Sequence, residues 1–164
     1  MNDKKFDELL AEHAAMLGRI ATSYESQPAA REDLLQDIAL ALWRALPQWR
    51  GEASLRSFVA RIAHNRCVNH IVAQKRHRHD AVVEDALIDQ RADPHRDVVN
   101  QQRYERLQRA LRRLPLGQRQ AVTLALEGFS HTEIAAALNI KVNNVDARVS
   151  RARRTLTEYL EERP

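Results

Sequence analysis

Apolar residues recur every three or four positions along most of the chain, which is the spacing of one face of an α-helix. The pattern predicts a first helix from Phe6 to Tyr24, with His13 packed on its apolar side. A helix over residues 54–74 is also predicted, with an apolar side formed by Leu55, Phe58, Val59 and Ile62. In the second half of that helix the same face becomes polar, which is unusual for a simple core helix.

Another predicted helix covers residues 31–46, between a break centred on Pro28 and a stop at Pro47. Its buried stripe is predicted to consist of Leu35, Ile38, Leu42 and Leu46. A second surface of this helix would then hold Leu34, Asp37, Ala41 and Trp43. A mixture of apolar, acidic and indole side chains on a helix is typical of a protein contact. The alternative is that Trp43 belongs to the core, since tryptophan is usually largely buried.

The helical period returns in the C-terminal part of the chain. One helix is predicted to end at Pro115, and the next covers residues 117–126, with an inward side formed by Val122, Ala125 and Leu126. Residues 80–97 interrupt the pattern, because they are acidic in balance and lack a clear period. They predict a linker that tethers two helical domains. The acidic tail from Glu158 is expected to fray.

Residues 128–156 carry the most specific motif. Ser130 and Glu133 have capping-box spacing, which predicts the start of a short helix. Asn139 follows it and tolerates the left-handed backbone conformation that ends a helix. A longer helix is predicted over residues 142–156, and its buried stripe consists of Val142, Val145, Val149, Ala152 and Leu156. A short helix, a tight turn and a longer basic helix together predict a helix-turn-helix.

The longer helix of this motif carries side chains suited to DNA. Asn143 and Asn144 lie at its start, where a recognition helix touches base edges, and their amides are able to pair with adenine. Arg148, Arg151 and Arg154 fall outside the buried stripe and are predicted to neutralise phosphates. The alternative is a helical hairpin with a solvated basic face.

A second basic segment runs from Arg50 to Arg78 and holds seven Lys or Arg residues against one acid. Asn65 and Asn69 alternate with these cations, so that cations would bind phosphate and amides would reach bases. The preceding loop, residues 48–54, combines tryptophan, arginine and glycine, which together are suited to stack and hold an unpaired base. The alternatives are a solvated charged face and a tryptophan that only covers the core.

Composition narrows the class of protein. The 164 residues, only four of them glycine, suit one ordinary domain or two small ones and favour an all-helical fold. A net charge of +4 favours a polyanionic partner. A single cysteine excludes an internal disulfide and suggests a reducing compartment. Because no apolar run reaches the length of a membrane span and the N-terminus is polar, we expect a soluble, cytoplasmic protein without membrane insertion.

His64, Cys67 and His70 follow one another at three-residue spacing, which spreads them over about a third of the helix circumference. A transition metal would be able to use two of them, but no second cysteine or carboxylate motif completes a site. Cys67 is therefore interpreted as a small buried residue. No Asp, Glu and His set has the spacing of a catalytic site. We predict no metal, no cofactor and no enzymatic activity; a histidine-dependent nuclease is the weakest alternative.

Four segments, in their order, resemble the extracytoplasmic-function (ECF) sigma factors, the minimal two-domain class of bacterial RNA polymerase sigma subunits. They are Arg-Glu-Asp-Leu-Leu-Gln-Asp-Ile at 31–38, Arg-Gly-Glu-Ala-Ser-Leu-Arg-Ser-Phe at 50–58, Arg-Ile-Ala-His-Asn-Arg-Cys-Val-Asn-His-Ile at 61–71, and Leu-Pro-Leu-Gly-Gln-Arg-Gln-Ala-Val at 114–122 with the helix-turn-helix after it. The resemblance implies an all-α fold of two small domains: sigma domain two at 1–79, a flexible acidic linker at 80–97 and sigma domain four at 98–164.

The resemblance also implies partners. One helix would dock on the clamp helices of the largest subunit of core RNA polymerase through Asp33, Leu34, Gln36, Asp37, Leu40 and Trp43. The loop at 49–54 and the helix after it would capture a flipped base of the upstream-ten promoter element, and the helix from Val142 would read the upstream-thirty-five element. The implied DNA-binding residues are Trp49, Arg50, Gly51, Ser54, Arg61, Asn65, Arg66, Asn69, Lys75, Arg76, Lys141, Asn143, Asn144, Asp146, Ala147, Arg148, Ser150, Arg151 and Arg154.

Two positions depart from the family pattern. Lys141 stands where members usually carry a small capping residue, and Asp146 stands where they often carry a cation. A carboxylate near the groove repels phosphate but accepts a hydrogen bond from cytosine. We therefore expect Asp146 to weaken DNA binding and to shift the sequence that this helix prefers.

Taken together, these features predict a transcription initiation factor that gives core polymerase its promoter specificity. Two weak DNA contacts would add once polymerase fixes their spacing. The resemblance further implies an anti-sigma factor that restrains the protein. The alternative is a stand-alone helix-turn-helix regulator that binds DNA without polymerase, and the polymerase-type helix over residues 31–46 argues against it.

Overall fold

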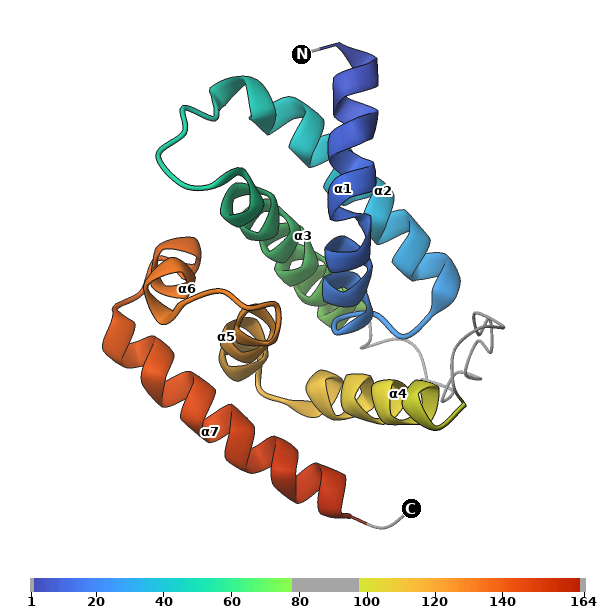
Figure 1. The fold of residues 1–164 in the computed structure, drawn as a ribbon. Helices are drawn as coiled ribbons and strands as arrows, with labels where there is room; N and C mark the ends of the chain where they lie inside the picture. Colours follow the sequence, from blue (N-terminus) through green and yellow to red (C-terminus); the bar gives the residue numbers. More distant parts are fainter. Residues whose placement is uncertain (1, 78–97, 163–164) are drawn as a thin grey trace. The chain divides into compact units, whose positions relative to one another are not determined.

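The computed structural model describes residues 2–77 and 98–162, and all regular secondary structure in these ranges is helical (Figure 1). The described residues fall into two compact units, one in each range. The N-terminal unit consists of α1 (Asp3–Thr22), α2 (Pro28–Ala45), the 3-10 helix η1 (Leu46–Gln48) and α3 (Leu55–His77). The C-terminal unit consists of α4 (Val98–Arg113), α5 (Leu116–Leu126), α6 (His131–Leu138) and α7 (Val142–Glu161). The all-α prediction is confirmed, while residues 80–97, predicted to be a linker, lie outside the described ranges.

In the N-terminal unit, α1, α2 and α3 each pack against the other two. Their shared core is apolar at its centre and includes Ile20, Leu34, Ile38, Leu42, Val59 and Ala63. His13 is buried beside it, and its Nδ1 lies 2.9 Å from the carbonyl oxygen of Leu9. The prediction that His13 is a packed histidine is therefore confirmed.

Two predictions for α2 are wrong. Leu34 is only 2 % exposed, whereas Leu35 is half-buried. Helical spacing allows either leucine beside Ile38, at three or four residues, and the packing of α1 and α3 against α2 covers Leu34. The helix also begins earlier than predicted, at Pro28. Proline is well tolerated in the first helical turn, where its missing N–H would have no partner in the helix anyway.

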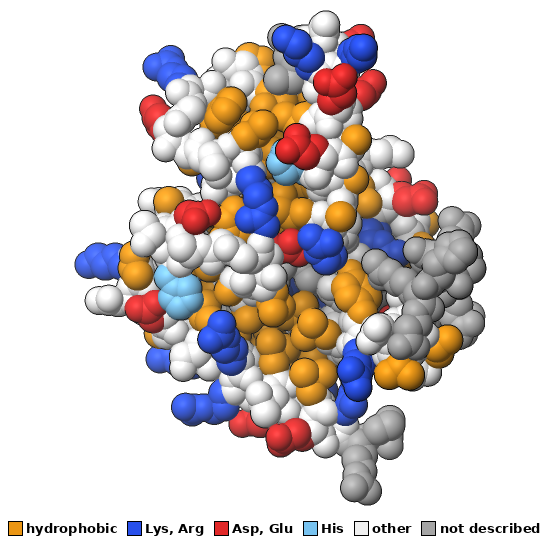
Figure 2. Space-filling model, viewed as in Figure 1, with side chains coloured by type: hydrophobic (Ala, Val, Ile, Leu, Met, Phe, Trp, Pro, Cys, Tyr) orange, Lys and Arg blue, Asp and Glu red, His pale blue; other side chains and the backbone are white. Residues whose placement is uncertain are grey.

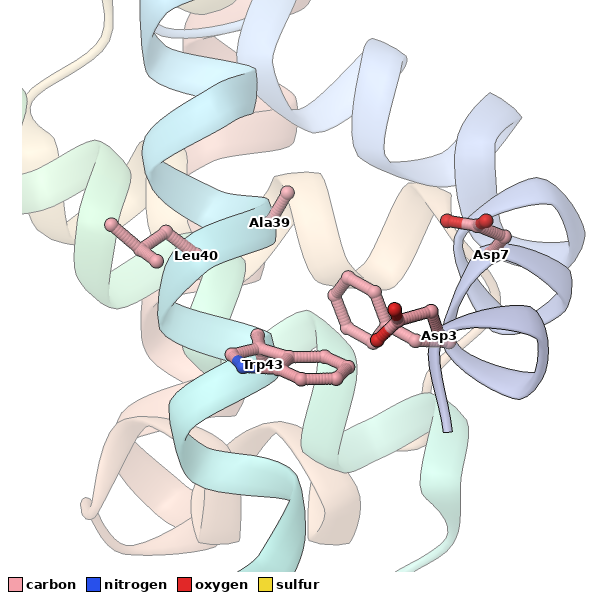
Figure 3. Close-up of a pocket in the computed structure, with 6 residues that line it drawn as sticks. Asp3, Asp7, Ala39, Leu40 and Trp43 are labelled. Atoms are coloured by element: carbon pink, nitrogen blue, oxygen red, sulfur yellow. The ribbon is translucent and has the colours of Figure 1, made fainter. Parts of the chain in front are cut away.

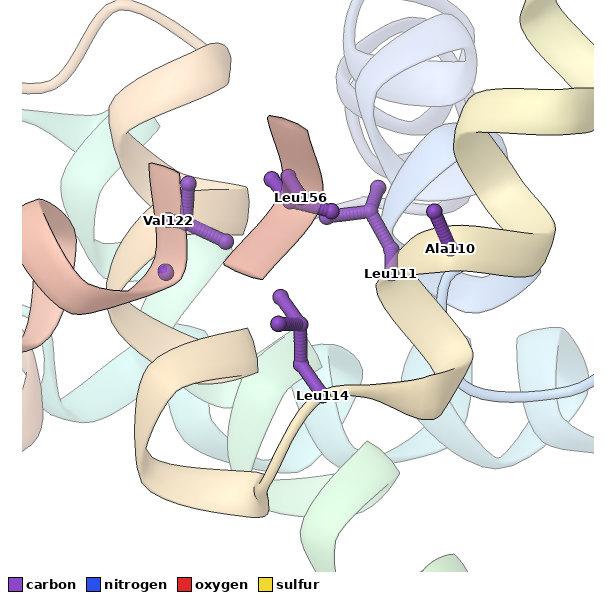
Figure 4. Packing of buried hydrophobic residues seen from close by; sticks show 6 residues of the cluster. Ala110, Leu111, Leu114, Val122 and Leu156 are labelled. Atoms are coloured by element: carbon purple, nitrogen blue, oxygen red, sulfur yellow. The ribbon is translucent and has the colours of Figure 1, made fainter. Parts of the chain in front are cut away.

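In the C-terminal unit α7 is the central helix, since α4, α5 and α6 all pack against it. Figure 4 shows Leu111 of α4 pointing toward Leu156 of α7. The buried cluster around them consists of Ala110, Leu111, Leu114, Val122, Ala152 and Leu156. Burying each large side chain of this kind contributes about 1.5–3 kcal/mol, so this cluster is a substantial part of what supports α7.

The predicted stripe of α7 is confirmed at Val145, Val149, Ala152 and Leu156, which are all buried. Val142 is exposed instead, and so is Leu126, which is 55 % exposed although it was predicted to face inward. Val142 is the first residue of α7 and Leu126 is the last residue of α5. A helical period does not tell whether a neighbouring helix extends far enough to cover such a terminal position.

The prediction that the chain frays from Glu158 is also wrong, because α7 continues to Glu161. Contacts with α4 hold this end. The Arg113 guanidinium donates to the Glu162 carboxylate at 2.9 Å and lies 3.8 Å from the centre of the Tyr159 ring. Arg106 donates to the Glu162 carbonyl at 3.1 Å. These partners are distant in sequence, so local composition did not reveal them.

Candidate nucleic-acid interface

The outer surface of α2 is both acidic and apolar. Asp33, Gln36 and Asp37 are exposed there. Two large apolar side chains stand beside them, since Leu40 is 45 % and Trp43 is 38 % exposed. This surface agrees with the predicted protein contact, except at Leu34. Because Leu34 is buried in the core, it is not available to a partner.

Trp43 forms one wall of a hollow of about 340 Å³ between α1 and α2 (Figure 3). Its indole meets the Phe6 ring edge-on, with centroids 4.9 Å apart and planes at 78°. Asp3, Asp7 and Leu40 complete the lining together with Ala39. An apolar floor with carboxylates at its rim suits a partner side chain that has an apolar stem and a cationic head.

The loop between η1 and α3 keeps its tryptophan near the surface. The Trp49 Nε1–H group donates to the carbonyl of Ala53 at 3.0 Å, which ties the two sides of the loop together. Gly51, at φ 79°, supplies the left-handed backbone of the turn between them. Ser54 then caps α3, because its Oγ accepts from the Ser57 N–H at 3.1 Å. The bond to Ala53 therefore positions the indole, which remains partly open to solvent.

A polar face follows this loop along α3. Arg61, Asn65, Asn69 and Arg76 follow one another at four, four and seven residues, so they lie on one side of the helix. The Arg61 guanidinium lies 5.5 Å from the centre of the Phe58 ring, next to the loop. All residues predicted to bind DNA in this unit are exposed except Arg66, which is half-buried. Their roles in DNA binding stay predictions.

The opposite side of α3 buries the residues considered as metal ligands. His64 is 1 % exposed, and its Nδ1 shares a hydrogen bond of 3.0 Å with the Tyr24 hydroxyl. Burial lowers the pKa of His64 to about 4 and raises the pKa of Cys67 to about 12, so both are neutral at pH 7. The interpretation of Cys67 as a buried residue is confirmed. Within the described ranges, no three His, Cys, Asp or Glu side chains are grouped as metal ligands would be.

His70 turns toward Glu25, a residue that sequence reasoning missed. Glu25 is buried and accepts hydrogen bonds from His70 Nε2 at 2.6 Å, from the Gln27 N–H at 2.8 Å and from Gln74. Burial by itself would raise the pKa of Glu25, but these hydrogen bonds outweigh it and lower the pKa. The cluster fastens the C-terminal half of α3 to the turn between α1 and α2. A lone glutamate between the predicted first helix and the predicted break gave no signal of this.

In the C-terminal unit, the helix-turn-helix is confirmed. Ser130 Oγ accepts from the Glu133 N–H at 3.1 Å and donates to the Glu133 carboxylate at 3.0 Å. Asn139 ends α6 in the left-handed conformation, at φ 53° and ψ 49°. α7 begins directly after Lys141, which makes no side-chain capping bond. The departure at Lys141 therefore removes a cap without preventing the helix.

The outer face of α7 displays the predicted DNA-binding side chains, and Figure 2 shows Lys and Arg side chains (blue) spaced along this helix. Those that are exposed are Lys141, Asn143, Asn144, Asp146, Ser150, Arg151 and Arg154, whereas Ala147 and Arg148 are half-buried. Arg148 passes close to the start of α5, where a Cβ on Gly117 would lie 3.3 Å from its guanidinium. Gly117 thus leaves room for this arginine.

Asp146 has a partner that the sequence did not predict. Its Oδ1 contacts Nδ1 of His131, the first residue of α6, and both side chains are exposed. The two residues are 15 positions apart, so no local pattern connects them.

Comparison with known proteins identifies the family. Residues 9–77 match the model described as Sigma-70 region 2, and residues 104–156 match Sigma-70, region 4. The ECF RNA polymerase sigma factor SigM of Mycobacterium tuberculosis is 33% identical over 94% of this chain and 76% of its own length. The RNA polymerase sigma factor NccH of Alcaligenes xylosoxydans xylosoxydans is 30% identical over 95% of this chain and 87% of its own.

Among solved structures, the sigma factor RpoE from Bartonella quintana, in complex with the anti-sigma factor NepR, has a TM-score of 0.79 at 25% identity. The alignment covers 98% of this chain and 99% of that one. Sigma-70 region 2 falls within the N-terminal unit and region 4 within the C-terminal unit. The chain therefore belongs to the ECF RNA polymerase sigma factors, which are transcription initiation factors. Within the described ranges, no helix is both long and apolar enough to cross a membrane.

Proposed function

We propose that this chain brings core RNA polymerase to its promoters by binding the polymerase through α2 and DNA through α3 and α7. The observation that carries the proposal is the exposed acidic and apolar surface of α2, which occurs together with two basic DNA-type surfaces in one chain. A stand-alone regulator needs one DNA-binding surface and a dimer contact. It does not need a second DNA-binding surface together with an acidic and apolar surface such as that of α2. The chain acts in the cytoplasm, without a cofactor and without catalysis of its own.

The polymerase contact consists of Asp33, Gln36, Asp37, Leu40 and Trp43. The two aspartates attract cations of the polymerase, and the two exposed apolar side chains supply the area that is desolvated on binding. The hollow beside Trp43 extends this contact to α1 and receives a cationic side chain of the partner.

The first DNA contact captures an unpaired base of the upstream-ten element. The Trp49 indole is exposed enough to stack on a base, while its bond to Ala53 keeps it from folding into the core. Asn65 and Asn69 offer amide groups to the base, and Arg61 and Arg76 offer cations to the phosphates on the same side of α3.

The second DNA contact places α7 in the major groove of the upstream-thirty-five element. Asn143 and Asn144 stand at its N-terminal end, where a recognition helix touches base edges. Arg151 and Arg154 neutralise phosphates farther along the helix. Since RpoE was solved in complex with an anti-sigma factor, we also infer that an anti-sigma factor restrains this chain by covering its DNA and polymerase surfaces.

Run-off transcription with purified core polymerase tests the proposal. The full chain should yield promoter-specific transcripts that core polymerase alone does not. The double substitution Asp33→Lys and Asp37→Lys should weaken core binding at least about tenfold, since two favourable charge contacts become repulsive. The double substitution Glu8→Lys and Glu12→Lys makes the same change of charge on the exposed side of α1 and serves as the matched control.

Two results would count against the proposal. One is unchanged core binding and transcription with the Asp33 and Asp37 variant. The other is tight, sequence-specific DNA binding by the isolated chain as a dimer, with no effect of core polymerase, which would favour the stand-alone regulator.

A further inference from the structure

Asp146 stands among side chains that face DNA, yet it carries the wrong charge for phosphate. Asn143, Asn144 and Arg148 lie within three residues of it on the same helix. A carboxylate at such a place costs affinity unless another group offsets its charge or it gains a hydrogen bond. The structure provides a hydrogen-bond partner for the carboxylate, because Nδ1 of His131 contacts it. Figure 2 shows a histidine side chain (pale blue) against an acidic one (red) over α6 and the start of α7.

The contact joins two parts of the chain that are held firmly. His131 is the first residue of α6, directly after the Ser130 cap, and the adjoining Ile134 is fully buried. Asp146 follows Val145, which is also fully buried in the packing of α7. Each member of the pair is therefore anchored within a few residues by a core side chain, so the packing of α6 on α7 keeps the imidazole and the carboxylate side by side.

The hydrogen bond between His131 and Asp146 determines which further hydrogen bonds the carboxylate can accept. A carboxylate only accepts hydrogen bonds, so the proton between the two groups is carried by His131 Nδ1. The Asp146 side chain remains 56% exposed in this contact. It therefore keeps acceptor capacity for a second donor from outside the protein.

In the major groove, the base-edge donors are the N4 amino group of cytosine and the N6 amino group of adenine. Adenine offers N7 as an acceptor beside its amino group, which suits an amide such as Asn143 and repels a carboxylate. Cytosine offers its amino donor without that neighbouring acceptor on the same base. A fixed carboxylate at the start of a recognition helix is thus best matched by cytosine.

We propose that Asp146, held in position by His131, selects a cytosine in the DNA element bound by α7. This inference rests on the proposed function, in which α7 reads promoter DNA. Asp146 is the specificity-determining residue in direct contact with the base, and His131 is a positioning residue that acts through it. The carboxylate gives specificity at one base pair, while the hydrogen bond from the imidazole holds it in place.

The test measures binding and transcription by the reconstituted holoenzyme on a set of promoters in which each base pair of the upstream-thirty-five element is varied in turn. With the unchanged protein, cytosine at one position should be preferred about tenfold over the other bases. Asp146→Ala should remove the preference at that position alone. Asp146→Asn should lower the preference for cytosine at that position, because the amide presents a donor as well as an acceptor.

His131→Ala should reduce the cytosine preference about threefold, whereas His131→Gln, which can still donate to the carboxylate, should restore most of it. Thermal unfolding of each variant shows whether the fold is kept. Glu158→Gln removes an exposed acid near the other end of α7 and should leave every preference unchanged.

The inference is overturned if Asp146→Ala strengthens binding equally on all promoters, since the carboxylate would then only repel DNA. It is also overturned if both His131 variants keep the full cytosine preference. In either case the unchanged holoenzyme still transcribes from its promoters, and the proposed function stands. If the unchanged holoenzyme shows no promoter-specific transcription at all, the proposed function itself fails.

Discussion

The two long basic helices of the molecule, α3 and α7, are supported in different ways. α7 rests on a continuous apolar stripe and packs into a cluster of leucine, valine and alanine side chains. α3 buries His64 beside its apolar residues and is fastened at its far end by the hydrogen bond from His70 to Glu25. A helix supported mainly by buried apolar area responds little to protonation, whereas one that also depends on buried polar groups responds to pH and to the loss of each hydrogen bond.

The largest expected effect comes from the apolar support of α7. Leu156→Ala should lower the free energy of unfolding of the C-terminal unit by about 2–5 kcal/mol, because it leaves a cavity in the buried cluster. Leu126→Ala, at a leucine that is 55 % exposed, is the matched control and should change little. Urea unfolding followed by circular dichroism measures both variants.

The fluorescence of Trp43 and Trp49 sharpens this measurement, because both tryptophans of the chain lie in the N-terminal unit. With Leu156→Ala, the urea midpoint followed by tryptophan fluorescence should not change. The midpoint of the C-terminal unit, followed by circular dichroism, should fall. A fluorescence transition that shifts equally would contradict the separate support of the two helices.

The next largest effect is a pH dependence of the N-terminal unit that comes from His64. Burial holds the pKa of His64 at about 4, against an ordinary value of 6.5 in the unfolded chain. The unfolded state therefore binds more protons between these values, and stability falls as the pH drops from about 6.5 to about 4. The loss amounts to at most about 3.5 kcal/mol, since each pKa unit corresponds to about 1.4 kcal/mol.

Urea unfolding followed by tryptophan fluorescence at pH 7 and pH 4.5 measures this loss. His64→Gln, which does not titrate and can still bond to Tyr24, should show a smaller loss on acidification than the unchanged protein. An equal loss in both proteins would assign the pH dependence to other groups.

A smaller effect should follow from Tyr24→Phe. The substitution removes the hydroxyl that shares a hydrogen bond with His64 and leaves that buried Nδ1 without its partner. We expect a loss of about 1–3 kcal/mol in the N-terminal unit, measured by tryptophan fluorescence during urea unfolding. Tyr159→Phe removes a hydroxyl from a half-buried ring of α7 and should leave this transition unchanged. No difference between the two variants would show that the buried hydrogen bond adds nothing to α3.

The smallest effect concerns the turn before α7. Asn139→Ala places a Cβ-bearing residue without a suitable side chain in the left-handed conformation and should cost about 1 kcal/mol. Asn139→Gly should cost less than Asn139→Ala, because glycine adopts this conformation without strain. Circular dichroism during urea unfolding distinguishes them. If alanine is tolerated as well as glycine, the turn does not depend on its backbone conformation.

The contrast between α3 and α7 also explains which features were predictable. The capping box of Ser130 and Glu133, the left-handed Asn139 and most of the stripe of α7 depend on residues a few positions apart. Interactions of that range repeat with the helical period, so the order of residues reveals them. The same holds for the family motifs that identified a sigma factor, because each is a continuous segment.

The order of residues by itself therefore determined the helices, the helix-turn-helix and the division of polar from apolar faces along α7. Tertiary structure decided that Leu34 is buried and Leu126 exposed, since only the position of neighbouring helices covers one and not the other. It also decided the pairs of Tyr24 with His64, of Glu25 with His70 and of His131 with Asp146, whose members are 40, 45 and 15 positions apart. No periodic pattern links residues at such distances, because their contact exists only after the helices have packed.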